Sequence, residues 1–313
     1  MAVAMVVLVA SPASAAKPAK GGGGGGSSTP TGIDVSYPQC PATSLPSGEA
    51  FAIVGVTGGL ANDYNACLGT EFAYAQGLAA ATSQPVAQLY VNTADPGNTV
   101  ADWPYGSSYG TNDPLGAYGT AVSSSGSTPY GTCSSYADSA PCAYVYGYDM
   151  VAGVASDGDG DAASNTDSDV DIPGGIAYFE SQTGKAAHAY QWWLDVETGN
   201  SWLSGTTGQQ MNVADLQGMT AALGAADSGT GVLGIGIYST SSQWNTITGS
   251  PGATITYGAT SLTNSLWSLP DWIPGARSLG AAESDCTLPS FTGGTVSIAQ
   301  WFGHPYDGDY ACP

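Results

Sequence analysis

Residues 190–202 constrain the fold of this chain more than any other segment. They read YQWWLDVETGNSW, in which Trp192, Trp193 and Leu194 are consecutive apolar residues. Because successive side chains of a strand point to opposite faces, this run is apolar on both faces. Such a strand is typical of a sheet that is covered on both sides. The Thr-Gly-Asn that follows predicts a turn at the carboxyl end of the strand.

Two acids, Asp195 and Glu197, stand at the end of this strand, two positions apart. Their carboxyl groups therefore point the same way. Neighbouring, partly desolvated carboxylates repel each other, which raises the pKa of at least one of them. A carboxyl that keeps its proton beside a charged one suits general acid catalysis. The alternative is that the pair caps the following helix or binds water, and the two interpretations stay open at this point.

The charge balance is extreme, with 25 acidic residues against 4 basic ones. Lys17 and Lys20 lie in the N-terminal tail, so the chain from Thr29 onward has only Lys185 and Arg277 against 25 acids, a net charge of −23. Phosphate binding depends on Lys and Arg, so nucleic acid and anionic membranes are excluded as partners. The same charge disfavours a phosphate-bearing cofactor, and we expect no cofactor.

The N-terminus has the pattern of an export signal. Residues 1–15 combine an apolar run with the small-x-small sequence Ala13-Ser14-Ala15, which predicts a signal peptide and a secreted protein. The run is too short to span a bilayer, and no later run is longer, so we expect no membrane anchor. Residues 16–30 are a Gly-rich linker by composition. The folded domain, expected as a monomer, is predicted at 31–313.

Six cysteines in an exported chain predict disulfides rather than metal or redox chemistry. Six cysteines allow 15 pairings, and we favour neighbours in sequence. The expected bonds are Cys40–Cys67, Cys133–Cys142 and Cys286–Cys312. The chain has no Cys-x-x-Cys and only two histidines, His188 and His304, which are interpreted as structural. No metal site or Ser-His-Asp triad is therefore expected.

Segments with strand character alternate with helical ones along the chain. Apolar runs predict strands at 32–36, 50–57, 85–92, 231–239, 268–276 and 296–301, in addition to the strand within 190–202. Helical spacing predicts helices at 66–83, 142–155 and 209–226. This order predicts an α/β fold, a (β/α) barrel of the TIM type. The long connection at 93–189 makes an insertion between the third and fourth strands.

Two parts of this insertion have a distinctive composition. Residues 93–141 are rich in Gly, Ser, Tyr and Pro, which is typical of a functional or disulfide-tied loop. Residues 156–171 are rich in Asp, and Asp157, Asp159 and Asp161 match the first positions of a calcium loop. Ala162 and Ser168 stand where that pattern needs Gly and Glu. A solvated acidic loop is favoured, and weak calcium binding stays open as the alternative.

The strand-end motifs together resemble glycoside hydrolase family 25. They are GIDVSYPQ, FAIVGVTGG, WLDVE, GIYS, DWIPGA and AQW followed by DGDY, and they extend over 32–310. The GIDVSYPQC opening and the LDVETGNSW block are also similar to actinobacterial glycoside-hydrolase-like proteins. Family 25 consists of secreted lysozyme-type muramidases on an irregular (β/α) barrel, so the resemblance implies that fold and a cell-wall glycan as substrate. The chain departs from the family pattern at Ala311, where the family has Asn.

The resemblance also implies roles for four acids. Asp34 matches the acid of the family's first strand, Asp195 and Glu197 match its Asp-x-Glu pair, and Asp309 matches the acid of its last strand. By this resemblance Glu197 is the general acid, and Asp195 orients the substrate's N-acetyl group or a water. Strand ends are also where barrel enzymes hold their catalytic groups. Exposed aromatic side chains are expected to bind sugar, and the candidates are Tyr37, Trp193, Trp202, Tyr238, Trp272 and Trp301.

Three functions remain compatible with the sequence. The first is a secreted glycosidase that acts on peptidoglycan or a related polysaccharide. The second is a catalytically inactive barrel that binds glycan through its aromatic side chains. The third is an exported structural or interaction protein that displays the long insertion. The four acids favour the first over the second, whereas the negative charge disfavours wall polymers rich in phosphate.

Overall fold

A computed structural model describes residues 31–41, 44–61, 63–79, 82–95, 127–133, 139–153, 174–303 and 305–313. The predicted signal peptide, the Gly-rich linker, the Asp-rich run at 156–171 and His304 lie outside the described residues. So does most of the segment 93–141. Its described part includes a short hairpin of β4 (Ser127–Thr128) and β5 (Gly131–Thr132).

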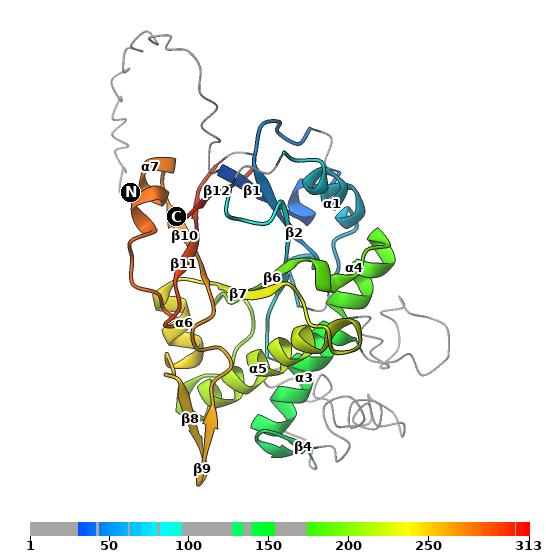
Figure 1. Ribbon diagram of the computed structural model, residues 1–313. Coiled ribbons are helices and arrows are strands. Elements are labelled where there is room, and N and C mark those ends of the chain that lie inside the picture. The colour runs from blue at the N-terminus through cyan, green and yellow to red at the C-terminus, as the bar shows by residue number, and fades with distance from the viewer. Residues whose placement is uncertain are drawn as a thin grey trace, which may run out of the picture.

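Eight strands close into one barrel, which confirms the predicted fold class (Figure 1). Their order around the barrel is β1-β12-β11-β10-β7-β6-β3-β2. The strands are β1 (Thr31–Val35), β2 (Phe51–Gly55), β3 (Ala87–Asn92), β6 (Gln191–Asp195), β7 (Gly234–Tyr238), β10 (Asp271–Ala276), β11 (Val296–Trp301) and β12 (Gly308–Ala311). The long insertion follows the third strand, as expected.

The last strand gives the barrel its irregular character. β12 runs antiparallel to both of its neighbours, β1 and β11, whereas the other barrel pairs are parallel. The connection between Trp301 and Gly308 is short, and a short connection forms a hairpin, whereas a parallel strand needs a crossover of a dozen or more residues. The final strand therefore returns toward the amino ends of the others.

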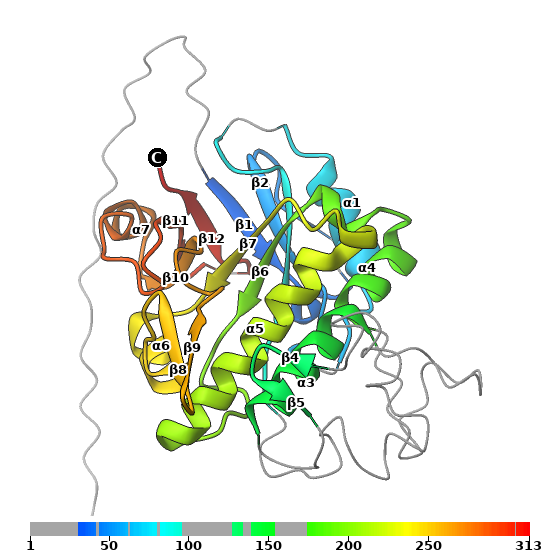
Figure 2. The same cartoon turned by 60° about the horizontal axis from the view of Figure 1, so that its bottom comes forward.

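Helices cover the outside of the barrel (Figure 2). One side has α1 (Leu68–Gln76), α3 (Ala140–Ala152), α4 (Gly175–Thr183) and α5 (Gly205–Gly229), and the other has α6 (Ser241–Thr248) and α7 (Leu279–Asp285). Helix α1 is shorter than the predicted 66–83, since it ends at Gln76 and is capped by Gly77. The sequence analysis missed α4, α6, α7 and the hairpin of β8 (Thr254–Tyr257) and β9 (Thr260–Thr263). Among the described residues, no helix is both long and apolar enough to cross a membrane.

Helices α3 and α5 approach closely because glycines face each other's backbone. A methyl group on Gly147 of α3 would lie 2.0 Å from the carbonyl oxygen of Asp215. A methyl group on Gly218 of α5 would lie 1.9 Å from the carbonyl oxygen of Tyr144. Only glycine permits this distance. The helix within the insertion is thereby packed tightly against the barrel's longest helix.

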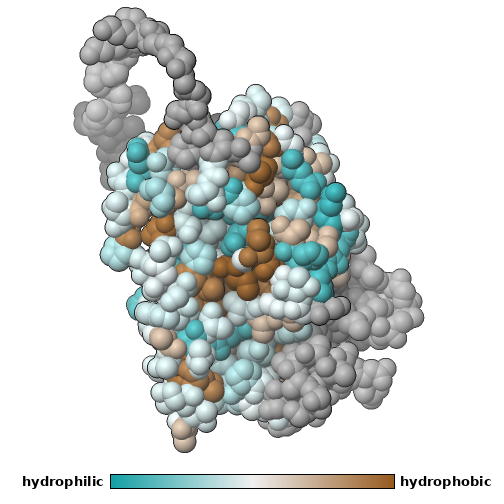
Figure 3. Space-filling model, viewed as in Figure 1, coloured by the Kyte–Doolittle hydropathy of each residue, from teal (hydrophilic) through white to brown (hydrophobic). Residues whose placement is uncertain are grey.

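The strand within 190–202 is buried on both faces, as its sequence predicts. Trp192 and Leu194 pack outward with residues of the surrounding helices, whereas Trp193 packs inward with Ile53 and Trp272. The apolar interior of the barrel is made of Ala50, Phe51, Ile53, Trp193, Trp272, Ile298 and Ala311. Apolar groups also reach the surface, and Figure 3 shows them in separate patches with hydrophilic surface between them.

All three expected disulfides are confirmed. Cys40 bonds to Cys67, Cys133 to Cys142, and Cys286 to Cys312. The last of these ties the end of α7 to the residue that follows β12. Loops of 26 and 27 residues closed in this way restrict the unfolded chain. The bonds therefore stabilise the folded state.

We predict that Asp215→Asn increases the free energy of unfolding at neutral and alkaline pH. Asp215 is fully buried, and neither carboxyl oxygen has a hydrogen-bond partner. Burial and then the charge of Asp95 raise its pKa well above the ordinary value. Because the folded state holds this proton more tightly than the unfolded state, the wild type loses stability as pH rises above about 4, its unfolded-state pKa. Asn does not ionise, so its advantage should grow with pH.

Urea unfolding at several pH values between 4 and 8 measures this effect. The control is Glu283→Gln, which removes one charge from an exposed position on α7. A difference between Asp215→Asn and wild type that stays constant over this pH range would contradict the prediction.

Candidate active site

A cavity of about 290 Å³ opens at the carboxyl ends of the barrel strands. Its walls come from β1, β3, β6, β7, β10 and β11 and from the loops that follow them. The lining residues are Asp34, Ser36, Tyr37, Pro38, Gln39, Gly59, Tyr90, Asn92, Asp195, Glu197, Tyr238, Trp272, Gln300 and Asp307. This volume lies at the lower end of the range of about 300–1,000 Å³ that is usual for ligand pockets. It suits one sugar ring rather than a long stretch of polymer.

Three of the four predicted acids line this cavity. Asp34 comes from β1, Asp195 is the last residue of β6, and Glu197 follows two residues later. A fourth lining acid, Asp307, comes from the connection between β11 and β12 and was not among the candidates. The side chains share the cavity because strand alternation turns each of the strand residues toward the barrel axis.

The fourth predicted acid, Asp309, lies deeper in the barrel and does not line the cavity. It is fully buried and accepts a hydrogen bond of 2.8 Å from Nε1 of Trp272. Because β12 is antiparallel, Asp309 pairs with Gly32, two residues before Asp34 on β1. Burial, followed by the charge of Asp34, raises the pKa of Asp309 well above its ordinary value. Asp309 therefore fixes the position of the Trp272 ring through this hydrogen bond and does not face the cavity itself.

Asp195 is 6% exposed and is held by a fixed amide. The Thr57 hydroxyl donates to Oδ1 of Asn92 at 2.8 Å, which turns the amide nitrogen toward Asp195. Nδ2 of Asn92 then donates to Oδ2 of Asp195. The other oxygen, Oδ1, is buried without a hydrogen-bond partner. Burial, and then the charge of Glu197, raises the pKa of Asp195 well above its ordinary value, despite the Asn92 hydrogen bond.

Asp34 is held from the opposite wall by a second amide. Nε2 of Gln300 donates to Oδ2 of Asp34 at 2.7 Å. The Tyr238 hydroxyl donates to Oε1 of the same glutamine at 3.0 Å, which fixes the orientation of the amide. Burial raises the pKa of Asp34 to about 7, with a further rise from Asp307, while the Gln300 hydrogen bond lowers it. This carboxyl therefore changes its charge near neutral pH.

The loop that carries Glu197 is fixed through its backbone. Nε1 of Trp202 donates to the carbonyl oxygen of Glu197 at 2.9 Å. The backbone N–H and the hydroxyl of Thr198 both donate to Oε1 of Gln243 on α6, at 2.7 and 3.0 Å. The Glu197 side chain is half-buried, so it is the more accessible member of the Asp195–Glu197 pair.

The six predicted aromatic residues divide into two groups. Tyr37, Tyr238 and Trp272 line the cavity, and Tyr37 is 49% exposed. The other three, Trp193, Trp202 and Trp301, do not line it. Alternation and packing place these three residues elsewhere, and their contact with substrate stays a prediction. Trp193 is 1% exposed in the barrel interior, where it donates to Gln88. Trp301 follows the inward-facing Gln300 and packs outward, and Trp202 holds the Glu197 loop instead.

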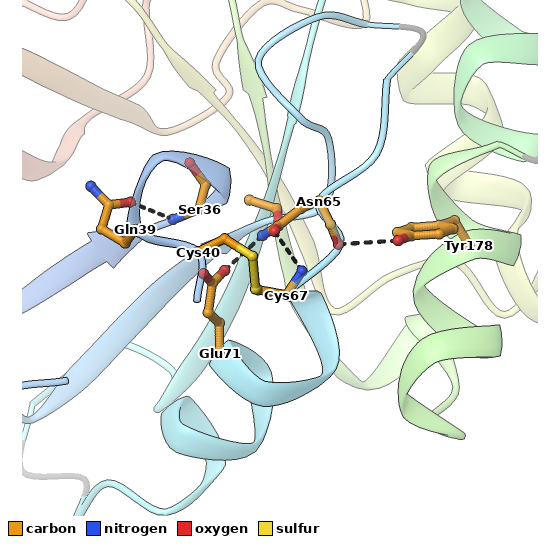
Figure 4. The surroundings of a disulfide bond; sticks show 8 residues. Ser36, Gln39, Cys40, Asn65, Cys67, Glu71 and Tyr178 are labelled. Atoms are coloured by element: carbon orange, nitrogen blue, oxygen red, sulfur yellow. Dashed lines mark hydrogen bonds between the residues drawn. A yellow bond between two sulfur atoms is a disulfide. The ribbon is translucent and has the colours of Figure 1, made fainter. Parts of the chain in front are cut away.

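The Cys40–Cys67 disulfide holds the turn that follows β1 (Figure 4). Residues Tyr37–Gln39 form a 3-10 turn after β1, and the Ser36 N–H donates to Oε1 of Gln39 at 3.0 Å. Cys40 then bonds to Cys67, the residue before α1. The loop that carries Tyr37 and Gln39 is thus tied to the body of the barrel.

Asn65 reinforces this anchor from three sides. Its side-chain nitrogen donates to the carbonyl of Gly55 at 2.8 Å and to Glu71 at 2.6 Å, and its oxygen accepts from the Cys67 N–H at 3.0 Å. The Tyr178 hydroxyl donates to its backbone carbonyl at 3.1 Å (Figure 4). The Asn65 side chain therefore joins β2 to α1, and its backbone carbonyl adds a contact to α4.

The sequence analysis missed six polar residues of the site: Ser36, Gln39, Tyr90, Asn92, Gln300 and Asp307. Two of them had a detectable signal, because Asn92 ends a predicted strand and Gln300 alternates in phase with the inward face of 296–301. The partners that these amides orient, Asp195 and Asp34, come from other strands. Among the described residues, no group of three His, Cys, Asp or Glu side chains is arranged to hold a metal ion.

Comparisons with known proteins give one structural likeness. No family model and no curated protein matches the sequence. The crystal structure of the bacterial lysozyme from Streptomyces coelicolor superposes with a TM-score of 0.45 and 18% identity, over 92% of this chain and 94% of that one. The barrel assignment for this chain rests on its own strand pairing.

We predict that Gln300→Met raises the pKa of Asp34 above its value of about 7, because the side chain that stabilises the carboxylate is lost. A ¹³C NMR titration of the Asp34 carboxyl measures the change. Tyr238→Phe is the matched comparison, since it removes only the hydroxyl that orients Gln300, and it should give a smaller rise. An unchanged or lower Asp34 pKa in Gln300→Met would show that the amide does not stabilise the charge.

Proposed function

We propose that this protein is a secreted glycoside hydrolase of the muramidase type, acting on a cell-wall or related polysaccharide with Glu197 as general acid. The observation that carries the proposal is the meeting of Asp34, Asp195 and Glu197 in one ring-sized cavity with aromatic walls. Glycosidases need carboxyl groups on both sides of the bond they cut. Tyr37, Tyr238 and Trp272 offer surfaces on which a sugar ring packs.

Asp195 and Glu197 have different roles in proton transfer. Burial, and then the charge of Glu197, raises the pKa of Asp195, so this carboxyl keeps a proton at pH values where an ordinary carboxyl has lost it. Glu197 is the more accessible member, so it delivers the proton to the glycosidic oxygen as the bond from that oxygen to the anomeric carbon breaks. Asp195 remains behind it, held by Asn92.

Asp34 acts from the opposite wall. Its carboxyl accepts from Gln300 through one oxygen, which leaves the other for a sugar hydroxyl or a water. With a pKa of about 7 it is partly ionised near neutral pH. In that state it stabilises positive charge that develops at the anomeric carbon. Gln300 and Tyr238 serve as positioning residues for this group.

Secretion is supported by covalent chemistry. All six cysteines are paired in three disulfides, and such bonds persist in oxidising compartments outside the cytoplasm. The apolar segment at 1–15 supplies the corresponding export signal.

A second candidate function is glycan binding without catalysis. The observation that favours it is the exposure of Tyr37, whose ring stands at the mouth of the cavity and is 49% exposed. Together with Trp272 and Tyr238 it forms an aromatic wall that holds a sugar whether or not a proton is transferred. The two functions differ in hydrolysis. Only the enzyme cuts the glycan, and it needs Glu197 to do so.

We predict that Glu197→Gln lowers the rate of glycan hydrolysis by about a hundredfold to ten-thousandfold, the usual contribution of general acid catalysis. The substitution keeps the shape of the side chain and removes its transferable proton, so glycan binding should survive. Release of reducing ends from peptidoglycan and from chitin-type oligosaccharides measures the rate. Glu283→Gln, with the same chemical change on the exposed surface of α7, should match wild type.

Activity that persists in Glu197→Gln would mean that another acid is the proton donor. Binding of glycan by wild type without hydrolysis of any of these substrates would support the second candidate instead.

A further inference from the structure

We infer that Trp267 forms a second sugar-binding site, outside the cavity, which holds an uncharged stretch of the glycan strand. The inference rests on the proposed function, because it takes the polymer named there as the ligand. A cavity of about 290 Å³ suits one sugar ring, so the cavity contacts only a small part of a polysaccharide. A second contact on the same strand adds affinity, because it forms at a high effective concentration.

Trp267 lies in the segment between β9 and β10 and does not line the cavity. Its side chain is 40% exposed, which makes it the most exposed tryptophan that the structure describes. Its backbone N–H donates to the Asn264 carbonyl at 3.1 Å, whereas its indole N–H has no acceptor among the described residues. The indole therefore offers a ligand both a flat apolar face and a free hydrogen-bond donor.

A glycine gives this ring a fixed seat. Gly293 has φ +85°, and a methyl group on it would lie 2.5 Å from Cη2 of Trp267. The ring therefore lies directly on the Gly293 backbone, where only glycine fits. The two segments are joined beside the ring, since the Ser268 N–H donates to the Thr292 carbonyl at 3.1 Å. A rigid aromatic side chain loses little conformational entropy when a ligand packs on it.

The cavity presents an exposed ring in the same way. A methyl group on Gly59, which has φ +93°, would lie 2.5 Å from Cε1 of Tyr37. Tyr37 lines the cavity and is 49% exposed. Trp267 on Gly293 repeats this arrangement outside the cavity. A ring that is supported on one face and open on the other suits packing against the C–H groups of a sugar.

The surroundings of Trp267 favour a neutral ligand. Residues 228–270 and 286–303, the segments that carry the ring and its seat, contain no Asp, Glu, Lys, Arg or His. The hairpin of β8 and β9, which precedes Trp267 in the chain, is rich in Thr (Figure 1). Hydroxyl and amide groups pair well with sugar hydroxyls. A second copy of this chain is disfavoured as the occupant, because two domains with a net charge of −23 repel each other.

Binding to an insoluble polymer tests the inference. We expect Trp267→Ala to weaken binding of the full-length protein to insoluble peptidoglycan, freed of anionic wall polymers, by roughly tenfold, the loss typical of a truncated aromatic anchor. Sedimentation measures the bound fraction, with Glu197→Gln present in every protein so that the polymer stays intact. Trp267→Phe should keep most of the binding, because a ring remains. Leu279→Ala truncates another apolar side chain of 40% exposure and should bind like its parent.

An NMR titration tests the site without truncating the ring. The indole N–H signal of Trp267, assigned by its loss in Trp267→Phe, should shift when soluble glycan fragments of peptidoglycan are added. Trp267→Ala with Glu197 intact should hydrolyse short soluble oligosaccharides at the wild-type rate, because Trp267 does not line the cavity.

The inference is overturned if Trp267→Ala binds peptidoglycan as tightly as its parent, if Leu279→Ala weakens binding equally, or if the indole signal does not shift. A change of oligomeric state in Trp267→Ala without a loss of glycan binding would also overturn it, since a second copy would then be the occupant. Failure of the proposed function is distinguishable. Trp267-dependent binding without any hydrolysis rejects the enzyme and keeps this site. Hydrolysis of soluble oligosaccharides without Trp267-dependent binding rejects this site and keeps the enzyme.

Discussion

The structure of the site depends on the burial of Asp195 at the end of β6. A carboxyl group that is removed from water needs hydrogen bonds or a cation, and the barrel interior offers no cation among the described residues. Asn92 from β3 supplies one donor, and Thr57 from the end of β2 holds that amide in place. Residues from β2, β3 and β6, which are neighbours in the barrel, therefore hold this one carboxyl group in place. Asp195 keeps one oxygen without a hydrogen-bond partner and has a raised pKa, and perturbed carboxyl groups of this kind are typical of functional sites.

A similar arrangement holds Asp34 on the far side of the barrel. The side-chain amide of Gln300 on β11 donates a hydrogen bond to Asp34, as the amide of Asn92 does to Asp195. The Tyr238 hydroxyl orients the Gln300 amide. Deeper in the barrel, Asp309 and Trp272 form a buried hydrogen bond in an interior that is otherwise apolar. The acids are thus placed in two levels, an upper one that meets the cavity and a lower one that supports its floor. Amides, rather than lysine or arginine, pair with the carboxyl groups at the upper level.

Rigidity at the rim comes from covalent bonds and from one buried amide. The Cys40–Cys67 bond and the Asn65 hydrogen bonds fix the loop that presents Tyr37 and Gln39. The Cys286–Cys312 bond holds the end of the chain after β12. The first bond starts from the turn after β1 and the second ends just after β12, and β1 and β12 are the strands that close the barrel. Ion pairs contribute little to this rigidity, because residues 31–313 contain only two histidines, one lysine and one arginine. His188 and Asp227, 2.8 Å apart, form the one that the described residues show.

The sequence by itself determined seven of the eight barrel strands and the presence, though not the ends, of α1, α3 and α5. It also determined the disulfide pairs and the presence of acids at the ends of the first strand and of the strand within 190–202. These features follow from patterns that are local in the chain, namely alternation, helical spacing and the nearness of paired cysteines. The tertiary structure alone decided which of the predicted residues share a cavity. Asp309 and Trp193 lie below the cavity, and Asn92, Gln300 and Asp307 join it, because strand order and the antiparallel direction of β12 set their depth. Depth in a barrel depends on the register between neighbouring strands, and no single strand's sequence records that register.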